Sequence, residues 1–168
     1  MHIAIISDIH DNIPNLEKVL DYCRKEKIGK MICCGDLMTV ETLGHLNENF
    51  SGEIFFALGN ADQRHFPEEL FKNHAYGKTK VLESFGEEEF DGKRVAFVHF
   101  PEAARELAET GKYDFVFHGH THKPWEEMIG NCKVLNPGNV ANQHYPPTFA
   151  IWNTKNDLFK LVRLNSLK

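Results

Sequence analysis

Short apolar runs recur along the first 60 residues, and polar or amphipathic segments separate them. Three of these runs predict buried parallel strands, because such strands are covered on both faces: residues 3–7, 31–34 and 54–58. Two intervening segments have helical character: the apolar stripe Leu16, Val19, Leu20 and Cys23, and residues 39–47. Asn12 and Pro14 fit the cap and first turn of the earlier helix. Alternating strands and helices predict an α/β arrangement with crossovers.

Turn dipeptides dominate the second half. Three of them predict hairpins: Asp91-Gly92, Gly130-Asn131 and Asn156-Asp157. Strands are expected at 94–99 and 113–117, a helix at 102–110 ending at Gly111, and a turn or two of helix at 67–72. We therefore expect parallel strands first and an antiparallel run to the C-terminus, with two sheets packed face to face in one domain, residues 1–168.

Composition and charge exclude several classes of protein. A chain of 168 residues is long enough for one compact core. Its net charge of -5 argues against a nucleic-acid-binding domain, which needs clustered Lys and Arg. No apolar stretch could span a membrane or serve as a signal peptide, so we expect a cytoplasmic protein. None of the four cysteines has C-x-x-C spacing, and all are expected to be reduced and buried: Cys23, Cys33, Cys34 and Cys132.

Five polar clusters directly follow predicted strands. They are Asp8-Ile9-His10, Gly35-Asp36, Gly59-Asn60-Ala61-Asp62, His99 and His118-Gly119-His120-Thr121-His122. In open α/β sheets ligands bind beyond the carboxyl ends of the strands, so these side chains are expected to converge. Carboxylate, amide and imidazole donors suit manganese, iron, zinc or nickel. The lack of cysteine argues against a structural zinc site.

Residue spacing supports a common site. Asp8 and His10 would point the same way if the chain stayed extended, and His120 and His122 repeat that spacing. Glycines beside the clusters would let the backbone turn where a Cβ could collide: Gly35, Gly59 and Gly119. Each motif alone is weak, because Gly-Asp and Gly-Asn are ordinary turn dipeptides and a lone His is usually structural. All five together predict a metal site.

These motifs resemble the signature of the calcineurin-like metallophosphoesterase family, and within it the small YfcE-type phosphodiesterases. The resemblance runs from Asp8 through Asn136-Pro137-Gly138. It implies an α/β fold of two mixed β-sheets packed as a sandwich and flanked by helices. It also implies a hydrolase of phosphoric esters, above all phosphodiesters, that uses two divalent metal ions. Manganese is the expected metal, with iron, zinc, nickel or magnesium as alternatives.

The family pattern implies a role for each matching residue. One metal would be held by Asp8, His10, Asp36 and His122, and the other by Asp36, Asn60, His99 and His120. Asp36 would bridge the two with one oxygen facing each metal, and a hydroxide shared by the metals would attack phosphorus. Asn60 and His99 are also candidate substrate contacts. Asp62 is expected to brace the Asn60 loop, and His118 to point away from His120 into packing.

The chain departs from the family pattern at a few positions. Ala61 stands where many relatives have a His thought to assist the leaving group, which favours substrates with good leaving groups or protonation by water. Phe100-Pro101 follows His99, Asp11 stands where Gly is commoner, and Asn139 stands where Ser is commoner. The remaining histidines are expected on the surface: His2, His45, His65, His74 and His144. His65 and His74 are the nearest of these to a candidate substrate contact, because they follow the third motif.

Three other functions remain open from the sequence. The enzyme could be a phosphomonoesterase or nucleotide pyrophosphatase, or the protein could bind metal without turnover. A scaffold is the third option, because the retromer subunit has a similar architecture without a full ligand set. The seven occupied ligand positions argue against a scaffold. The expected partner is a small phosphate ester, and a homo-oligomer is compatible with the sequence.

Overall fold

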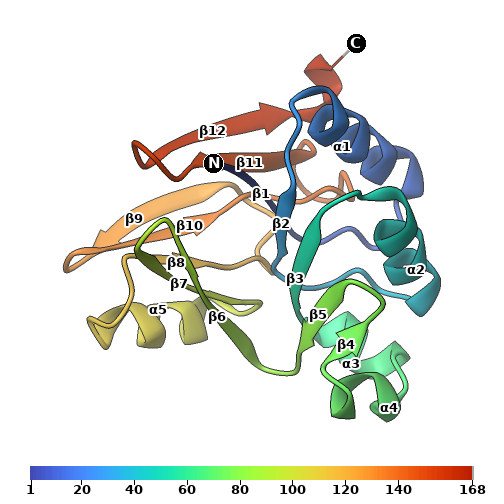
Figure 1. The fold of residues 1–168 in the computed structure, drawn as a ribbon, viewed down its shortest axis with the longest axis horizontal. Helices are drawn as coiled ribbons and strands as arrows, with labels where there is room; N and C mark the ends of the chain where they lie inside the picture. Colours follow the sequence, from blue (N-terminus) through green and yellow to red (C-terminus); the bar gives the residue numbers. More distant parts are fainter. Residues whose placement is uncertain (168) are drawn as a thin grey trace.

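Two mixed β-sheets form the centre of the structure, a computed structural model that describes residues 1–167 apart from the side chains of residues 71 and 72 (Figure 1). The larger sheet has the order β12-β11-β1-β2-β3-β5-β4. Its strands are β1 (His2–Ile6), β2 (Lys30–Cys33), β3 (Glu53–Ala57), β4 (Ala75–Tyr76), β5 (Thr79–Leu82), β11 (Thr148–Asn153) and β12 (Leu158–Arg163). Strands β1, β2, β3 and β5 are parallel, as the alternation of strands and helices predicts.

The smaller sheet has the order β6-β7-β8-β10-β9. Its strands are β6 (Phe85–Phe90), β7 (Lys93–Val98), β8 (Phe115–Phe117), β9 (Trp125–Ile129) and β10 (Cys132–Asn136). The helices are α1 (Ile13–Lys25), α2 (Val40–Asn49), α3 (Asn60–His65), α4 (Glu68–Lys72) and α5 (Pro101–Glu109), followed by a 3₁₀ turn at Leu164–Ser166. Among the described residues, no helix has both the length and the apolar character needed to cross a membrane.

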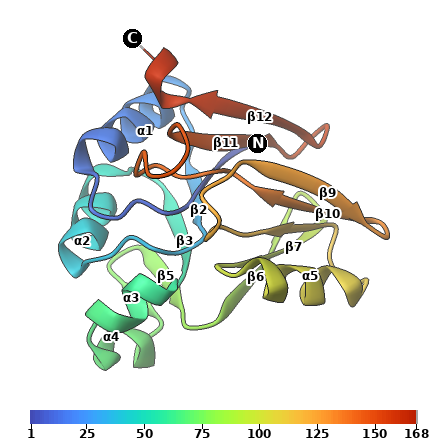
Figure 2. The same ribbon diagram turned by 180° about the vertical axis from the view of Figure 1, so that it is seen from behind.

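The layers follow from the two-residue period of the strands. In β1, Ile3 and Ile5 face the smaller sheet, whereas Ala4 and Ile6 face helices α1 and α2. Helix α5 covers the other face of the smaller sheet through Ala104. The order is thus helices, sheet, sheet, helix, which confirms the predicted sandwich (Figure 2).

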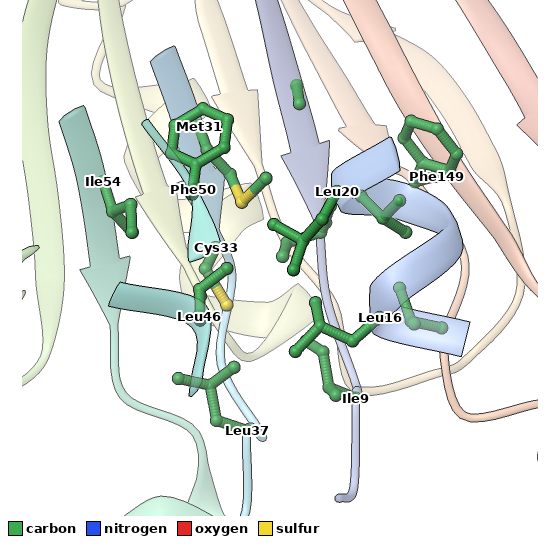
Figure 3. Close-up of a cluster of buried hydrophobic side chains, with 14 of the residues drawn as sticks. Ile9, Leu16, Leu20, Met31, Cys33, Leu37, Leu46, Phe50, Ile54 and Phe149 are labelled. Atoms are coloured by element: carbon green, nitrogen blue, oxygen red, sulfur yellow. The ribbon is translucent and has the colours of Figure 1, made fainter. Parts of the chain in front are cut away.

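The core under α1 and α2 is the largest cluster of buried apolar side chains. In Figure 3, Leu16 and Leu20 of α1 and Leu46 of α2 lie over the sheet residues Met31 and Cys33. Burying side chains of this size contributes about 1.5–3 kcal/mol each. The helical stripe read from the sequence is therefore the stripe that fixes α1 on the sheet.

The predicted antiparallel run to the C-terminus is confirmed within its two hairpins, β9–β10 and β11–β12, but the run is not continuous. Strand β8 is parallel to both β7 and β10, and the β11–β12 hairpin joins the larger sheet beside β1. Helix α5 lies between β7 and β8 in the chain and makes the crossover that their parallel pairing needs. Helix α3 and the short strands β4 and β5 were not predicted. All three hairpin turns are confirmed, since each joins two antiparallel strands.

Candidate metal centre

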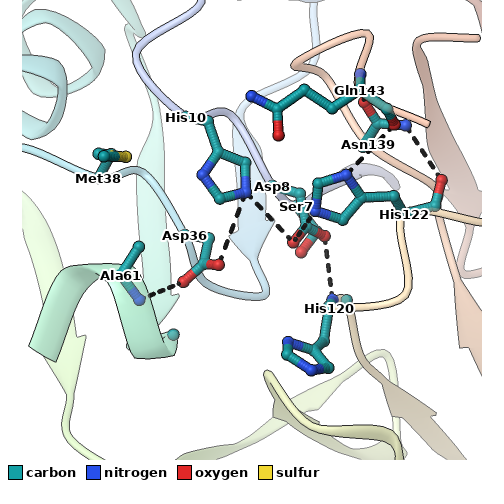
Figure 4. A network of polar contacts seen from close by, with 12 residues as sticks. Ser7, Asp8, His10, Asp36, Met38, Ala61, His120, His122, Asn139 and Gln143 are labelled. Carbon is teal, nitrogen blue, oxygen red and sulfur yellow. Dashed lines mark hydrogen bonds and ion pairs between the residues drawn. The ribbon is translucent and has the colours of Figure 1, made fainter. Parts of the chain in front are cut away.

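The five polar clusters meet where the carboxyl ends of β1, β2, β3, β7 and β8 come together. Figure 4 shows Asp8, His10, Asp36, Ala61, His120 and His122 of these clusters. Backbone hydrogen bonds join the loops: the amides of Asp8 and Ile9 donate to the carbonyl oxygens of Gly35 and Asp36 at 3.0 and 2.8 Å. The amide of Gly119 donates to the carbonyl of His99 at 3.0 Å and links the loops of the smaller sheet. The structure therefore confirms the prediction that the polar clusters converge at the ends of the strands.

Asp36 lies between two histidines. Its Oδ2 is 3.6 Å from His10 Nε2 and 3.4 Å from His99 Nε2, and its Oδ1 accepts a hydrogen bond from the amide of Ala61 at 2.8 Å. Whether each carboxylate oxygen faces one metal stays a prediction, but the two oxygens differ in their surroundings. The amide occupies one oxygen, and the other oxygen alone lies between the two imidazoles.

Asp8 organises the other side of the centre. Its Oδ1 is 3.3 Å from His122 Nε2 and 3.9 Å from His10 Nε2. Its Oδ2 accepts a hydrogen bond from the amide of His120 at 3.1 Å. The side chain has no exposed surface, so its charge lies in a low-dielectric environment where a cation would be held strongly.

The remaining predicted ligands gather around His99. Its Nε2 is 3.2 Å from Asn60 Oδ1 and 3.1 Å from His120 Nδ1. The ring of Phe100 lies edge-on to both imidazoles, with centroid distances of 5.1 Å to His99 and 4.9 Å to His120. All seven residues predicted as ligands thus lie together, in two groups that meet at Asp36.

Carbonyl oxygens fix the tautomers of two histidines. His99 Nδ1 lies 2.8 Å from the carbonyl oxygen of Cys34, and His122 Nδ1 lies 3.3 Å from that of Gln143. A carbonyl can only accept, so each Nδ1 carries a proton and donates it. In the neutral imidazole each Nε2 then presents its lone pair to the centre, as metal-binding imidazoles do.

Two buried atoms of the centre have no hydrogen-bond partner. They are Asp8 Oδ1 and His10 Nε2, two of the four such side-chain atoms among the described residues. Buried polar atoms are almost always paired, because leaving one unpaired costs about 1–3 kcal/mol. Two three-residue groups have ligand atoms within 4.8 Å of one another: Asp8 with His10 and His122, and Asp8 with Asp36 and His99. The donor set and its unpaired atoms fit divalent cations.

The backbone of the centre is strained. Five of the seven predicted ligands have positive φ: Asp8 at 54°, His10 at 44°, Asp36 at 57°, His120 at 68° and His122 at 59°. The assumption that the chain stays extended through Asp-x-His and His-x-His is therefore wrong. Such conformations cost roughly 1–3 kcal/mol each and cluster at functional sites.

Asp62 holds the Asp36 loop in place. Its carboxylate accepts hydrogen bonds from the amides of Asp36, Met38 and Gly59 at 2.7, 2.9 and 2.8 Å. Burial raises the pKa of Asp62 to about 6, although these bonds oppose the shift. The residue therefore braces the second and third motifs together, which is broader than the expected bracing of the Asn60 loop.

Close packing explains the glycines beside the ligands. A Cβ at Gly119 would lie 1.8 Å from Ser7 Oγ, and one at Gly59 would lie 2.1 Å from Asp36 Oδ1. At Gly35, where φ is +97°, it would lie 2.5 Å from His99 Nδ1. The sequence-based expectation for these three glycines agrees with this geometry.

The carboxylates act on the titration of the imidazoles. Burial lowers the pKa of His10. Burial opposes the charge on His99 too, but its hydrogen bond with Asp36 and the charges of Asp8 and Asp36 raise its pKa. The adjacent carboxylate of Asp8 raises the pKa of His122. Two imidazoles of the metal-free protein thus hold protons more readily than free histidine.

Sequence reasoning missed residues that support the centre. Asn136 Nδ2 donates to the carbonyl of Gly119 at 2.8 Å and to Thr121 Oγ1 at 3.0 Å, and Asn139 Nδ2 donates to the carbonyl of His122 at 3.0 Å. The sequence signal that could have pointed to these contacts is the Asn-Pro-Gly motif that begins at Asn136, together with the Asn139 that follows it.

The remaining histidines lie largely as expected. His118 is buried, as predicted. His2, His65, His74 and His144 are exposed, and His45 is half-buried and paired with Glu17. In the described part of the chain, His65 and His74 make no hydrogen bond, ion pair or ring contact with the seven predicted ligands.

Comparison with known proteins agrees with the geometry. The calcineurin-like phosphoesterase superfamily domain matches residues 1–157. The phosphodiesterase MJ0936 of Methanocaldococcus jannaschii is 29% identical over 168 residues, which cover 98% of this chain and 99% of that protein. A solved structure described as a novel archaeal phosphodiesterase has a TM-score of 0.83 at 27% identity, covering 97% of this chain and 99% of its own.

A more distant structure shares the fold. The YfcE phosphoesterase from E. coli has a TM-score of 0.68 at 21% identity, covering 100% of this chain and 96% of that chain. The match to the family domain covers most of the sequence and includes all five clusters. The chain belongs to the calcineurin-like phosphoesterase family and is a hydrolase of phosphoric ester bonds.

Proposed function

We propose that the protein hydrolyses a phosphodiester with the help of two divalent metal ions. Asp8, His10, Asp36 and His122 would hold one ion, and Asp36, Asn60, His99 and His120 the other. The observation that carries the proposal is the pair of buried atoms without partners, Asp8 Oδ1 and His10 Nε2, beside the Asp36 Oδ2 that lies between two imidazoles. When bound, such ions lower the pKa of water from 15.7 to about 7 and neutralise charge on phosphoryl oxygens.

The protein's own groups prepare this chemistry. Carbonyl oxygens hold a proton of His99 and of His122 on Nδ1, so that in the neutral imidazole the lone pair lies on Nε2. Asp62 and the amide of Ala61 fix Asp36 before any ion arrives. Such preorganisation is the main way in which a protein assists charge development at a reacting phosphoryl group.

The diester class is supported by the names of two relatives, the phosphodiesterase of M. jannaschii and the novel archaeal phosphodiesterase. Ala61 offers no side-chain proton donor, so we expect diesters with good leaving groups to be hydrolysed fastest. Of the two predicted substrate contacts, Asn60 is partly exposed and His99 is buried. Asn60 is therefore the more accessible of the pair.

The test is hydrolysis of bis-p-nitrophenyl phosphate with added Mn²⁺, compared with the same protein in EDTA. Asp36→Ala should abolish hydrolysis and weaken metal uptake, because Asp36 serves both ions. Asp21→Ala is the matched control, since Asp21 is exposed on α1 and pairs with Arg24. Hydrolysis that persists in EDTA or in Asp36→Ala would overturn the proposal.

Several finer points stay predictions. Manganese as the resident metal, a cytoplasmic location, a homo-oligomer and one domain over residues 1–168 rest on the sequence and the family resemblance. A scaffold role is disfavoured because all seven ligand positions carry residues able to bind a metal. Metal analysis of the purified protein decides between the metals proposed.

A further inference from the structure

The loop of residues 139–145 lies against the metal centre and is anchored to it from several sides. The amide of Ala141 donates to the carbonyl of Asp8 at 3.0 Å, and Asn139 donates to the carbonyl of His122. Asn139 also accepts from the amide of Gln143 at 3.0 Å. From the other side, Asn12 at the start of α1 donates to the carbonyl of Ala141 at 2.9 Å. The loop is therefore held in one conformation relative to the proposed ligands.

His144 sits in a strained turn within this loop. The amide of Tyr145 donates to the carbonyl of Gln143 at 2.7 Å, which closes a γ-turn centred on His144, and the φ of His144 is 62°. A γ-turn with positive φ at a residue other than glycine is rare and strained. The other such turn in the described chain is centred on the proposed ligand His120, where the amide of Thr121 donates to the carbonyl of Gly119 at 2.8 Å. Strain of this kind is retained where a side chain must be presented in a fixed direction.

The side chains of Gln143 and His144 are exposed and lie beside the proposed ligands. The ring centroid of His144 lies 5.5 Å from that of His122, in an edge contact. The side chain of Gln143 points from the loop toward His10 (Figure 4). Within the described residues, neither the Gln143 amide nor the His144 imidazole makes a hydrogen bond through its side-chain polar atoms. Both can donate an N–H, one from an amide and one from an imidazole.

We infer that Gln143 and His144 donate hydrogen bonds to phosphoryl oxygens of the substrate, on the side of the centre formed by His10 and His122. This inference rests on the proposed function, because it places the substrate phosphate at the metal centre. It adds a specificity-determining pair that neither metal binding nor the five motifs require. The anionic oxygens of a phosphate ester are the strong acceptors that such fixed donors suit.

The test measures binding of inorganic phosphate to the Mn²⁺-loaded protein by titration calorimetry, together with the KM for bis-p-nitrophenyl phosphate. Gln143→Ala and His144→Ala should each weaken phosphate binding about tenfold or more, because each removes a hydrogen bond to a charged acceptor. KM should rise by a similar factor with little change in kcat, because the hydrogen bonds are made equally in the ground state and in the transition state. His2→Ala, an exposed histidine at the start of β1, should leave both unchanged.

Two further variants separate a binding role from a structural one. His144→Gly relieves the positive φ, so the metal-free variant should be no less stable than the parent protein while phosphate binding is still lost. His144→Asn keeps an N–H donor and tolerates positive φ, so it should retain most of the binding. If Gln143→Ala and His144→Ala both take up metal and bind phosphate as tightly as the parent protein, this inference is overturned while the proposed function stands. Absence of metal uptake by the parent protein would overturn the proposed function.

Discussion

The imidazole of His99 and the carbonyl oxygen of Cys34 form a 2.8 Å hydrogen bond that joins the two sheets. Cys34 follows β2 of the larger sheet and His99 follows β7 of the smaller one. The bond fixes the proton on Nδ1 and turns Nε2 toward Asp36 Oδ2 at 3.4 Å. The sandwich therefore orients a proposed ligand directly, since this contact depends on how the sheets pack.

Metal affinity should depend on pH because protons compete for the imidazoles. The carboxylates raise the pKa of His99 and of His122, and a metal can bind only after the proton has left Nε2. Apparent Mn²⁺ affinity should therefore fall as the pH falls from 8 to 6, by up to about tenfold per pH unit for each proton displaced. Calorimetric titrations at both pH values check this, and equal affinities would contradict it.

In the metal-free protein, the same protons on His99 and His122 should increase the free energy of unfolding at low pH. A histidine whose folded pKa is raised contributes stability that is fully present below its unfolded pKa of about 6.5 and is lost as the pH rises through the folded value. In EDTA, replacing His122 by Gln should therefore remove more stability at pH 5.5 than at pH 8.5. Urea unfolding at the two pH values measures the difference, and an equal loss would show that the pairing with Asp8 does not stabilise the charged form.

Gly59→Ala should both destabilise the protein and weaken metal binding. The added Cβ would lie 2.1 Å from Asp36 Oδ1 and 2.6 Å from the Asp36 amide nitrogen, so the backbone or the ligand must move. We expect a loss of about 1–3 kcal/mol in the free energy of unfolding, the usual cost of overpacking. Gly29→Ala is the matched control, because nothing lies within 4 Å of its added Cβ and it should change stability by less than about 0.5 kcal/mol. Equal stability of the two variants would refute the close approach of Gly59 to Asp36.

Asp62→Ala should be among the most destabilising single changes at the centre. It leaves the amides of Asp36, Met38 and Gly59 without their acceptor in a buried place, which costs about 3 kcal/mol or more in total. Because Asp62 braces the loop and is not a proposed ligand, the folded variant should still bind two metals, with lower affinity. Urea unfolding and metal titration together check this, and loss of one site at full stability would instead make Asp62 a ligand.

Strand-end chemistry was the part of the site that could be predicted from the sequence. Asp8, Asp36 and His122 follow apolar runs, and the carboxyl ends of parallel strands share one edge, so their meeting followed from the pattern. The positive φ values did not follow, because Asp and His tolerate that conformation more often than most residues but do not require it, and the packing of the loops imposes it. One Asp36 oxygen lies between two histidines, and the amide of Ala61 donates to the other oxygen. This arrangement could not be predicted, because Ala61 lies in helix α3, which the sequence pattern did not indicate.

The fold, too, could be predicted only in part. The strands and crossovers of the first half were predicted because each buried strand has its own apolar run. The parallel pairing of β10 with β8 and the place of the β11–β12 hairpin beside β1 could not be predicted, because a hairpin turn fixes only the pairing of its own two strands. The contact between Gln143 and His122 could not be predicted, because the acceptor is a backbone carbonyl oxygen, which every residue has.

Crystals grown with Mn²⁺ and measured at the manganese absorption edge give the most direct test of the central claim. The account predicts two anomalous peaks per chain, both beside Asp36, one among Asp8, His10 and His122 and the other among Asn60, His99 and His120. A map without a peak beside Asp36, or with a single ion there at saturating Mn²⁺, would contradict a two-metal centre.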